Sequence, residues 1–171
     1  MSGMSGMSGM SGEPVYLSTK TYTHSVGLSA AFRQWRAESH CHFLHGYSLE
    51  IRVVFVAVGG LDVRNWAVDF GGLKSFKGLL EDTFDHKTLV AEDDPELKTF
   101  EELARKKIID LVVVPACGCE RFAGMIYEVA QVHLVDMGYG DRVDVYEVEV
   151  KEHAANSAIA RNPRFFSDLH A

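Results

Sequence analysis

The sequence predicts an α+β domain built on an antiparallel sheet. Three observations predict it: alternating apolar residues in "SLEIRVVFVAVGG", a long amphipathic helix pattern in "CERFAGMIYEVAQVHLVDMG", and renewed alternation in "RVDVYEVEVKE". Strand patterns come first, helix patterns follow, and a strand pattern closes the chain. This order is typical of an α+β domain and differs from the regular strand–helix alternation of parallel sheets.

Length and composition agree with a single globular domain. The chain has 171 residues, of which 47% are hydrophobic and 24% charged, enough for a substantial core. The opening triplet repeat "MSGMSGMSGMSG", residues 1–12, has little to bury and is interpreted as a flexible tail or cloning artefact. Residues 13–171 are expected to form the domain.

The charge balance and cysteine content restrict the function. A formal net charge of -7 without a Lys/Arg block argues against a nucleic-acid surface, although a local anion pocket stays open. Three cysteines do not make a disulfide framework, and a reduced, cytoplasmic location is expected. We expect no membrane span and no signal peptide.

The first half of the chain is expected to supply strands. Residues 15–32 read as an extended segment rich in β-branched and aromatic residues. Residues 48–60 form a strand that ends at a Gly-Gly turn, and residues 66–72, "WAVDFGG", form a shorter one, so that a hairpin covers 48–70. One face of the longer strand should carry the apolar residues Leu49, Ile51, Val53 and Phe55.

Helices and a last strand follow. Residues 73–84 and 99–111 have amphipathic patterns, and residues 119–138 have the clearest one, with Gly138 as the stop signal. The apolar stripes are expected to contain Leu73, Phe76, Leu79 and Leu80 in the first helix, and Phe122, Met125, Ile126, Val129 and Val132 in the longest. In the last strand, Tyr146, Val148, Val150 and Glu152 share a parity, so a carboxylate ends an apolar row.

The stretch "SHCHFLHGYSLE" gathers His40, Cys41, His42 and His45 in front of the first long strand. Such a cluster is typical of a metal site or a nucleophile. Several segments, in order, resemble the 6-pyruvoyl-tetrahydropterin synthase family, which includes the 6-carboxytetrahydropterin synthases. "LHGYSLEIRVVF" is similar to the family's LHGHxYxVxV strand, "WAVDFGGLK" to GMVxDFxxLK, "FDHKTL" to LDHxxLN, "GCERFA" to PTxENxA and "VEVKEHAANSA" to VxVxETxxxxA. The resemblance covers roughly residues 25–160.

The resemblance implies a tunnelling fold (T-fold), a four-stranded antiparallel sheet with two main helices on one face. It also implies that three such sheets join edge to edge as a barrel and that two barrels stack into a homohexamer. The ligand pocket would then lie between subunits. Edge-to-edge joining also suits antiparallel sheets physically, because open edges invite pairing.

In that family three histidines hold a zinc ion, and this chain departs from the pattern. The resemblance places His45 at one ligand position, Phe32 of "LSAAF" at the second and Tyr47 at the third. A catalytic zinc needs three protein ligands, so we expect no zinc and no other cofactor. A relocated site that uses His40, His42 and His45 remains the alternative.

The resemblance implies catalytic roles for Cys41, Asp85 and His86. Cys41 stands where the 6-carboxy branch places a general base, and a neighbouring subunit would supply Asp85 and His86 to relay the proton. The alternative is that Cys41 is a small packing residue and that Asp85 and His86 form a turn.

The resemblance also implies a binding role for Glu152, whose carboxylate would accept two hydrogen bonds from the N–H edge of a pterin ring. Gly118, Cys119 and Glu120 stand at the start of the long helix, where backbone N–H groups could bind a ring carbonyl or a phosphate. The alternatives are a solvated strand-end Glu152 and a Glu120 that only favours the helix dipole.

The sequence therefore predicts a divergent family member that binds a pterin, deazapurine or purine between subunits, without zinc and without the usual synthase reaction. One alternative is an active zinc-dependent lyase that acts on 7,8-dihydroneopterin triphosphate. The other is a non-catalytic oligomeric binding module.

Overall fold

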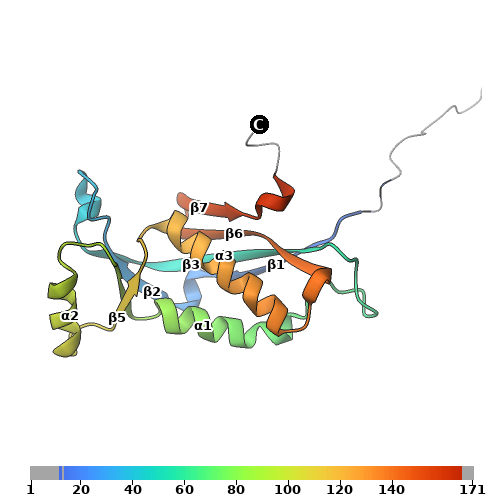
Figure 1. The fold of residues 1–171 in the computed structure, drawn as a ribbon, viewed down its shortest axis with the longest axis horizontal. Coiled ribbons are helices and arrows are strands. Elements are labelled where there is room, and N and C mark those ends of the chain that lie inside the picture. The colour runs from blue at the N-terminus through green and yellow to red at the C-terminus, as the bar shows by residue number, and fades with distance from the viewer. Residues whose placement is uncertain (1–11, 13, 167–171) are drawn as a thin grey trace, which may run out of the picture.

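The computed structural model describes residue 12 and residues 14–166, so the expected tail 1–12 lies almost entirely outside the described residues. Strands of this part form one seven-stranded sheet in the order β5-β4-β2-β3-β6-β7, with β1 beside β3 (Figure 1). The strands are β1 (Leu17–Tyr22), β2 (Leu28–Phe32), β3 (His45–Ala57), β4 (Lys87–Ala91), β5 (Leu111–Val114), β6 (Val143–His153) and β7 (Asn156–Arg161). The helices are α1 (Lys74–Phe84), α2 (Leu97–Arg105) and α3 (Cys119–Asp136).

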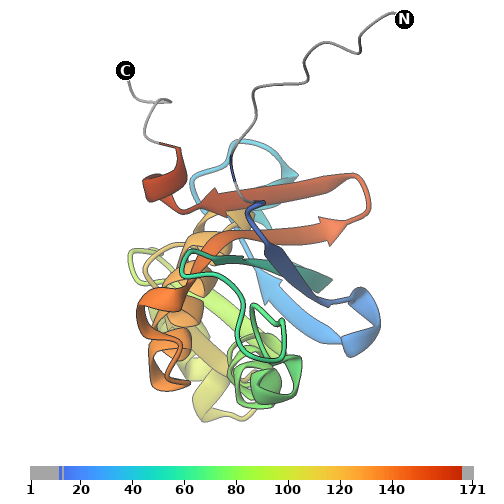
Figure 2. The ribbon, with the colours of Figure 1, turned by 90° about the vertical axis from the view of Figure 1, so that its right-hand side faces the viewer.

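The predicted α+β tunnelling fold is confirmed. In its four-stranded antiparallel part, β1 and β2 pair with successive parts of β3 on one side and together take one place in the sheet. On the other side of β3 lies β6, and β7 follows it. The helices α1 and α3 cover one face of it (Figures 1 and 2). The strands β4 and β5 extend the sheet in parallel beyond β2. Those two strands were not predicted, and α2 ends at Arg105, short of the predicted 99–111.

The core lies between the sheet and α1 and α3. The predicted row on β3 is confirmed, since Leu49, Ile51, Val53 and Phe55 are each at most 1% exposed. The expected helix stripes are only partly right. Leu80 is buried as expected, but Leu79, Val129 and Val132 are exposed, while Phe84, Ala130 and Leu134, which were not expected, are buried. A narrower face of each helix therefore contacts the sheet than the apolar pattern suggested.

A bulge in β6 changes the predicted apolar row. Val54 pairs with Glu147 and Phe55 pairs with Val145, so Tyr146 is the extra residue. The bulge reverses the parity, and Val145 joins Val148 and Val150 in the core while Tyr146 does not. Tyr146 packs instead against Phe165 and Phe166, at ring-centroid distances of 5.6 and 5.4 Å. Of the predicted row, Val148 and Val150 are in the core, and a second register shift between Lys151 and His153 makes Glu152 an extra residue in the pairing of β6 with β7.

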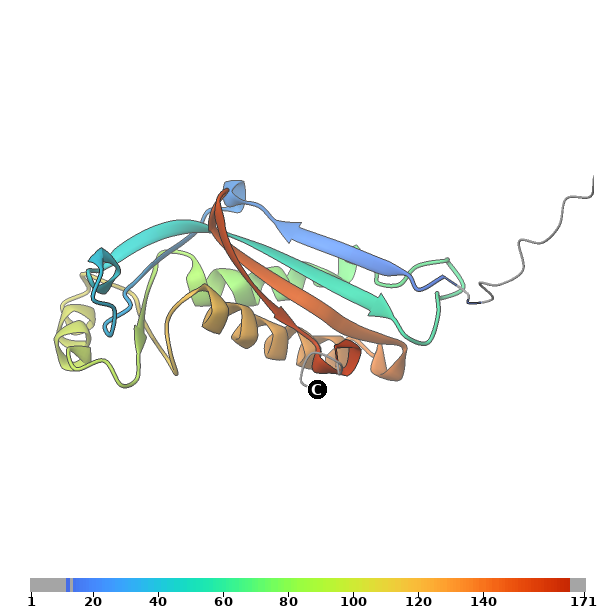
Figure 3. The ribbon, with the colours of Figure 1, turned by 90° about the horizontal axis from the view of Figure 1, so that it is seen from above.

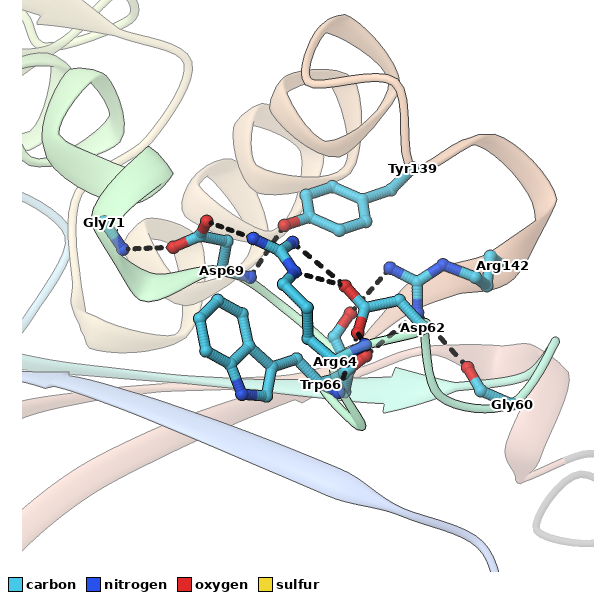
Figure 4. Close-up of polar contacts among 9 residues, drawn as sticks. Gly60, Asp62, Arg64, Trp66, Asp69, Gly71, Tyr139 and Arg142 are labelled. Carbon is cyan, nitrogen blue, oxygen red and sulfur yellow. Dashed lines mark hydrogen bonds and ion pairs between the residues drawn. The ribbon is translucent and has the colours of Figure 1, made fainter.

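The predicted strand over residues 66–72 is wrong. This segment belongs to an irregular connection that ends in a 3₁₀ turn, Phe70–Leu73. Side chains satisfy its backbone groups (Figure 4). The guanidinium of Arg142 donates to the carbonyls of Gly60, Trp66 and Ala67, and Asp62 accepts from the N–H groups of Arg64 and Trp66. A strand partner is therefore not needed there.

Within residues 14–166, no helix has both the length and the apolar composition needed to cross a membrane.

Candidate functional site

The fold brings the three expected metal positions together. Phe32 on β2 is the register partner of His45 on β3, and Tyr47 follows on the same face of β3. The ring centroids lie 5.5 Å apart for Phe32 and His45, 6.1 Å for Phe32 and Tyr47, and 5.5 Å for His45 and Tyr47. These positions form an aromatic cluster at the end of the sheet.

These side chains do not fit a zinc ion. Phe32 has no donor atom, and burial, followed by the charge of Glu152, raises the pKa of Tyr47, which keeps its phenol protonated. The His45 Nδ1 atom lies 2.7 Å from the Phe43 carbonyl oxygen and must donate to it, so only Nε2 is free. Across the described residues, no group of three or more His, Cys, Asp or Glu side chains is arranged to hold a metal.

The turn that holds the extra histidines lies just before β3. His40, Cys41 and His42 form a 3₁₀ turn capped by Ser39. The His42 Nδ1 atom lies 2.7 Å from the Ser39 carbonyl oxygen, and the backbone N–H of Gln34 donates to the Cys41 carbonyl. Cys41 is half-buried and His40 is exposed.

Glu152 lies in a cavity of about 370 Å³ at the start of α3. The cavity is lined by Gln34, Gly118, Cys119, Glu120, Glu152, Ala155, Asn156, Ser157 and Ala158. Burial, followed by the charges of Glu152 and Glu120, raises the pKa of the Cys119 thiol to about 12. The thiol is therefore neutral beside the Glu152 carboxylate. Four predicted binding residues meet in this cavity.

Gly118 has a backbone that only glycine adopts easily, with φ of 119°. A Cβ atom at this position would lie 2.1 Å from Gln34 Nε2. That amide is fixed because it donates to the Cys117 carbonyl at 2.9 Å. Gly118 is also the N-cap of α3 and offers no side-chain cap, so the first N–H groups of the helix stay available to a ligand.

Sequence reasoning missed Gln34, Asn156 and Ser157 as lining residues. Gln34 follows β2 and lies 83 positions from the Cys117 carbonyl that it contacts, so no local pattern could indicate it. Asn156 and Ser157 begin β7, directly after the turn that follows Glu152. Their proximity to Glu152 in sequence was the available signal.

Asp85 and His86, two of the three predicted catalytic residues, form a hydrogen-bonded pair. They connect α1 to β4, and Asp85 Oδ1 accepts from His86 Nδ1 at 2.6 Å. His86 has a left-handed backbone, with φ of 57°, and its side chain is 86% exposed. Within residues 14–166, no hydrogen bond or ion pair joins this pair to Cys41, and the expectation that a neighbouring subunit supplies the pair stays a prediction.

The environments of the thiols predict selective labelling. Burial raises the pKa of Cys117 to about 11 and is also the main reason for the high pKa of Cys119. At pH 8 we expect a thiol reagent to modify Cys41 quickly and the other two only after unfolding. Mass spectrometry of native and denatured protein measures this. Equal labelling of all three thiols in native protein would contradict the burial.

Comparison with known proteins identifies the family of this chain. A sequence model of the 6-pyruvoyl tetrahydropterin synthase family matches residues 21–163. A comparison with curated proteins found no match.

Solved structures support the same fold. An uncharacterized protein from Wolinella succinogenes superposes with a TM-score of 0.72 at 21% identity, covering 88% of this chain and 99% of that one. The 6-pyruvoyl tetrahydropterin synthase of Plasmodium falciparum gives 0.64 at 14% identity, with 88% and 99% covered. That of Caenorhabditis elegans gives 0.58 at 17%, with 87% and 96% covered. With the family match over most of its length, the chain belongs to the 6-pyruvoyl tetrahydropterin synthase family.

Proposed function

We propose that the protein binds a pterin-like ring, such as a pterin, a deazapurine or a purine, in the Glu152 cavity, without zinc and without the usual synthase reaction. The proposal includes a homohexamer with its pockets between subunits and a cytoplasmic location. If catalysis remains, Cys41, Asp85 and His86 are the groups available for a metal-free proton transfer.

One observation carries the proposal. The Glu152 cavity keeps a carboxylate and the free N–H groups of α3, whereas the neighbouring aromatic cluster offers one free imidazole nitrogen. Two carboxylate oxygens match two parallel N–H donors of a guanidine-like ring edge. The helix N–H groups match an acceptor on the opposite side of such a ring. The polar contacts that recognise a ring are therefore supported, and metal coordination is not.

The neutral Cys119 thiol has a positioning role in this proposal. It lines the same cavity as Glu152 at the start of α3, and in this proposal a hydrogen bond from the thiol holds the carboxylate in one orientation. Its hydrogen bond also leaves lone pairs on the carboxylate for the ligand.

Substitution of Glu152 by Gln tests the anchor. Gln replaces one acceptor oxygen by a donor NH₂ group and removes the charge, so one of the two ring N–H groups meets a donor. We expect pterin affinity to fall by about 10- to 100-fold, the effect of a lost charge-assisted hydrogen bond. Titration with pterin, followed by fluorescence, measures it.

Glu101→Gln is the matched control, since Glu101 lies exposed on α2 and should leave pterin affinity unchanged. Unaltered binding by Glu152→Gln would reject Glu152 as the anchor. A wild-type protein that binds neither pterin nor purine would reject the proposal.

A further inference from the structure

A second cavity, of about 470 Å³, adjoins the Glu152 cavity at the start of α3. Glu120 lines both cavities, so a molecule that fills one of them lies next to the other. The connection after β2, the region of α2 and β5, and the start of α3 gather at this end of the molecule (Figures 1 and 3). The volume is large enough for a small molecule or for a substantial part of one.

One pair of charges in the second cavity is already neutralised. Arg36 Nη2 donates to Asp93 Oδ2 at 2.7 Å, and Trp35 Nε1 donates to the other oxygen of that carboxylate at 3.0 Å. The Arg36 guanidinium also stacks on the Trp35 ring, 4.0 Å from the ring centroid. The hydrogen bonds from Arg36 and Trp35 hold the pKa of Asp93 below its usual range. These three side chains therefore form an ordered wall of the cavity without a free charge.

Arg121 is a cation of this cavity without a partner. Within residues 14–166, its guanidinium makes no hydrogen bond or ion pair, and the same holds for the exposed carboxylates of Glu120 and Glu128. Arg121 and Glu128 lie two turns apart on α3, so both share the face on which Gly124 lies between them. One free guanidinium and two free carboxylates therefore border the cavity.

The floor of the cavity is open and apolar. A Cβ atom built at Gly124 would meet no heavy atom of a neighbouring segment within 4 Å. Pro115, Ala116 and Met125 also line the cavity and add apolar surface. The cavity thus combines apolar contacts with one group that can bind an anion.

The charges around Arg121 favour one class of anion. A guanidinium can bind either a carboxylate or a phosphate through two parallel hydrogen bonds. Glu120 and Glu128 repel both anions, and the repulsion grows with the charge of the ligand. A phosphate monoester carries about -1.5 to -2 charges at pH 7, whereas a carboxylate carries a single charge. The cavity therefore favours a carboxylate.

We propose that the ligand of the Glu152 cavity carries an apolar tail that ends in a carboxylate, and that this tail passes Glu120 and binds Arg121 in the second cavity. The inference rests on the proposed function, because Glu152 holds the ring of the same ligand. Arg121 then selects among ring compounds by their tails, while Pro115, Ala116 and Met125 contact the apolar part of the tail.

Two ring compounds test the tail. Pterin has none, and folic acid joins a pterin ring to a benzoyl group that carries glutamate carboxylates. In fluorescence titrations, the wild-type protein should bind folic acid about tenfold more tightly than pterin, the effect of one charge-assisted interaction. Arg121→Gln should remove this difference and leave pterin affinity unchanged. Arg105→Gln, at an exposed guanidinium on α2, should change neither affinity.

Two results of these titrations would overturn the inference alone. One is folic acid that binds no more tightly than pterin, and the other is a difference that Arg121→Gln preserves. If the wild-type protein binds no pterin, the proposed function fails. The tail without the ring, 4-aminobenzoylglutamate, still tests the second cavity in that case. At millimolar concentration it should shift NMR signals of the wild-type protein but not of Arg121→Gln, and equal shifts or none would reject the site.

Gly124→Leu tests the floor of the cavity. The leucine side chain projects into the open space and maintains the helix, since Leu is a better helix former than Gly. We expect folic acid to lose its advantage over pterin, whereas pterin affinity stays unchanged. Gly78→Leu on α1 is the matched control, because a Cβ atom there also meets nothing within 4 Å. Unchanged folic acid affinity in Gly124→Leu would overturn the proposed path of the tail.

A phosphate tail tests the preference for carboxylate. Guanosine and guanosine 5′-monophosphate share a guanine ring and differ in one phosphate group. We expect the phosphate to add nothing to the affinity, because Glu120 and Glu128 repel it. A phosphate that strengthens binding as much as the folic acid tail does, with a gain that Arg121→Gln removes, would overturn the choice of carboxylate.

Discussion

Changing Phe32 and Tyr47 to histidine should turn the protein into a zinc protein. The backbone already places both positions beside His45, with ring centroids 5.5 Å from it. Three imidazoles with an open fourth position are the ligand set of a catalytic zinc site. Elemental analysis of purified protein should find about one zinc per chain in the double variant and far less in the wild type.

The two single variants test whether zinc binding requires all three imidazoles. Phe32→His and Tyr47→His each supply only two imidazoles together with His45, so neither should retain zinc through dialysis against a weak chelator. Stoichiometric zinc in the wild-type protein would contradict the aromatic interpretation of this cluster. A double variant that folds but takes up no zinc would show that the three positions do not form a metal geometry.

Phe122→Ala should be among the most destabilising single changes in the chain. Phe122 is fully buried on α3, with its ring edge-on to Phe32 at 5.0 Å and to Phe84 at 5.5 Å. Truncation leaves a cavity where the sheet, α1 and α3 meet, and the expected loss is about 3–5 kcal/mol in the free energy of unfolding. Urea denaturation followed by circular dichroism measures it.

Val132→Ala on the same helix is the matched control, because Val132 is 62% exposed and its loss should stay within about 0.5 kcal/mol. A comparable loss in both variants would mean that burial of the side chain does not set the size of the effect, since both substitutions raise helix propensity. In that case the three-way contact at Phe122 would not be central to the core.

The parts of the fold that could be predicted were those in which apolar residues recur at a regular spacing. The two-residue alternation of β3 correctly identified its buried face, because every residue of that row meets the same layer of helices. The alternation of β6 misled at Tyr146, since one extra residue reverses the parity and a bulge has no reliable sequence signal. Residues 66–72 resembled a strand, but Arg142, far along the chain, satisfies their carbonyls.

In the candidate site too, the residues with a local sequence pattern could be predicted and the contacts between distant segments could not. Glu152 could be predicted because it ends an apolar row on a strand, and Gly118 and Cys119 because they start a clear helix. Their convergence depends on the packing of α3 across β6 and β7, and Gln34 reaches the site from the segment that follows β2. Contacts between such distant segments come from tertiary packing, which a single sequence does not display.

Phe32 stands at a position that the resemblance assigns to a metal ligand and is at the same time part of the core, so a substitution there affects both a metal site and the packing. A first step at Phe32 places an imidazole without a partner against Phe122, and a first step at Tyr47 yields only two donors. Neither intermediate has a working metal site. Two substitutions are therefore needed to complete three imidazoles around His45, and the one at Phe32 also replaces a buried core ring.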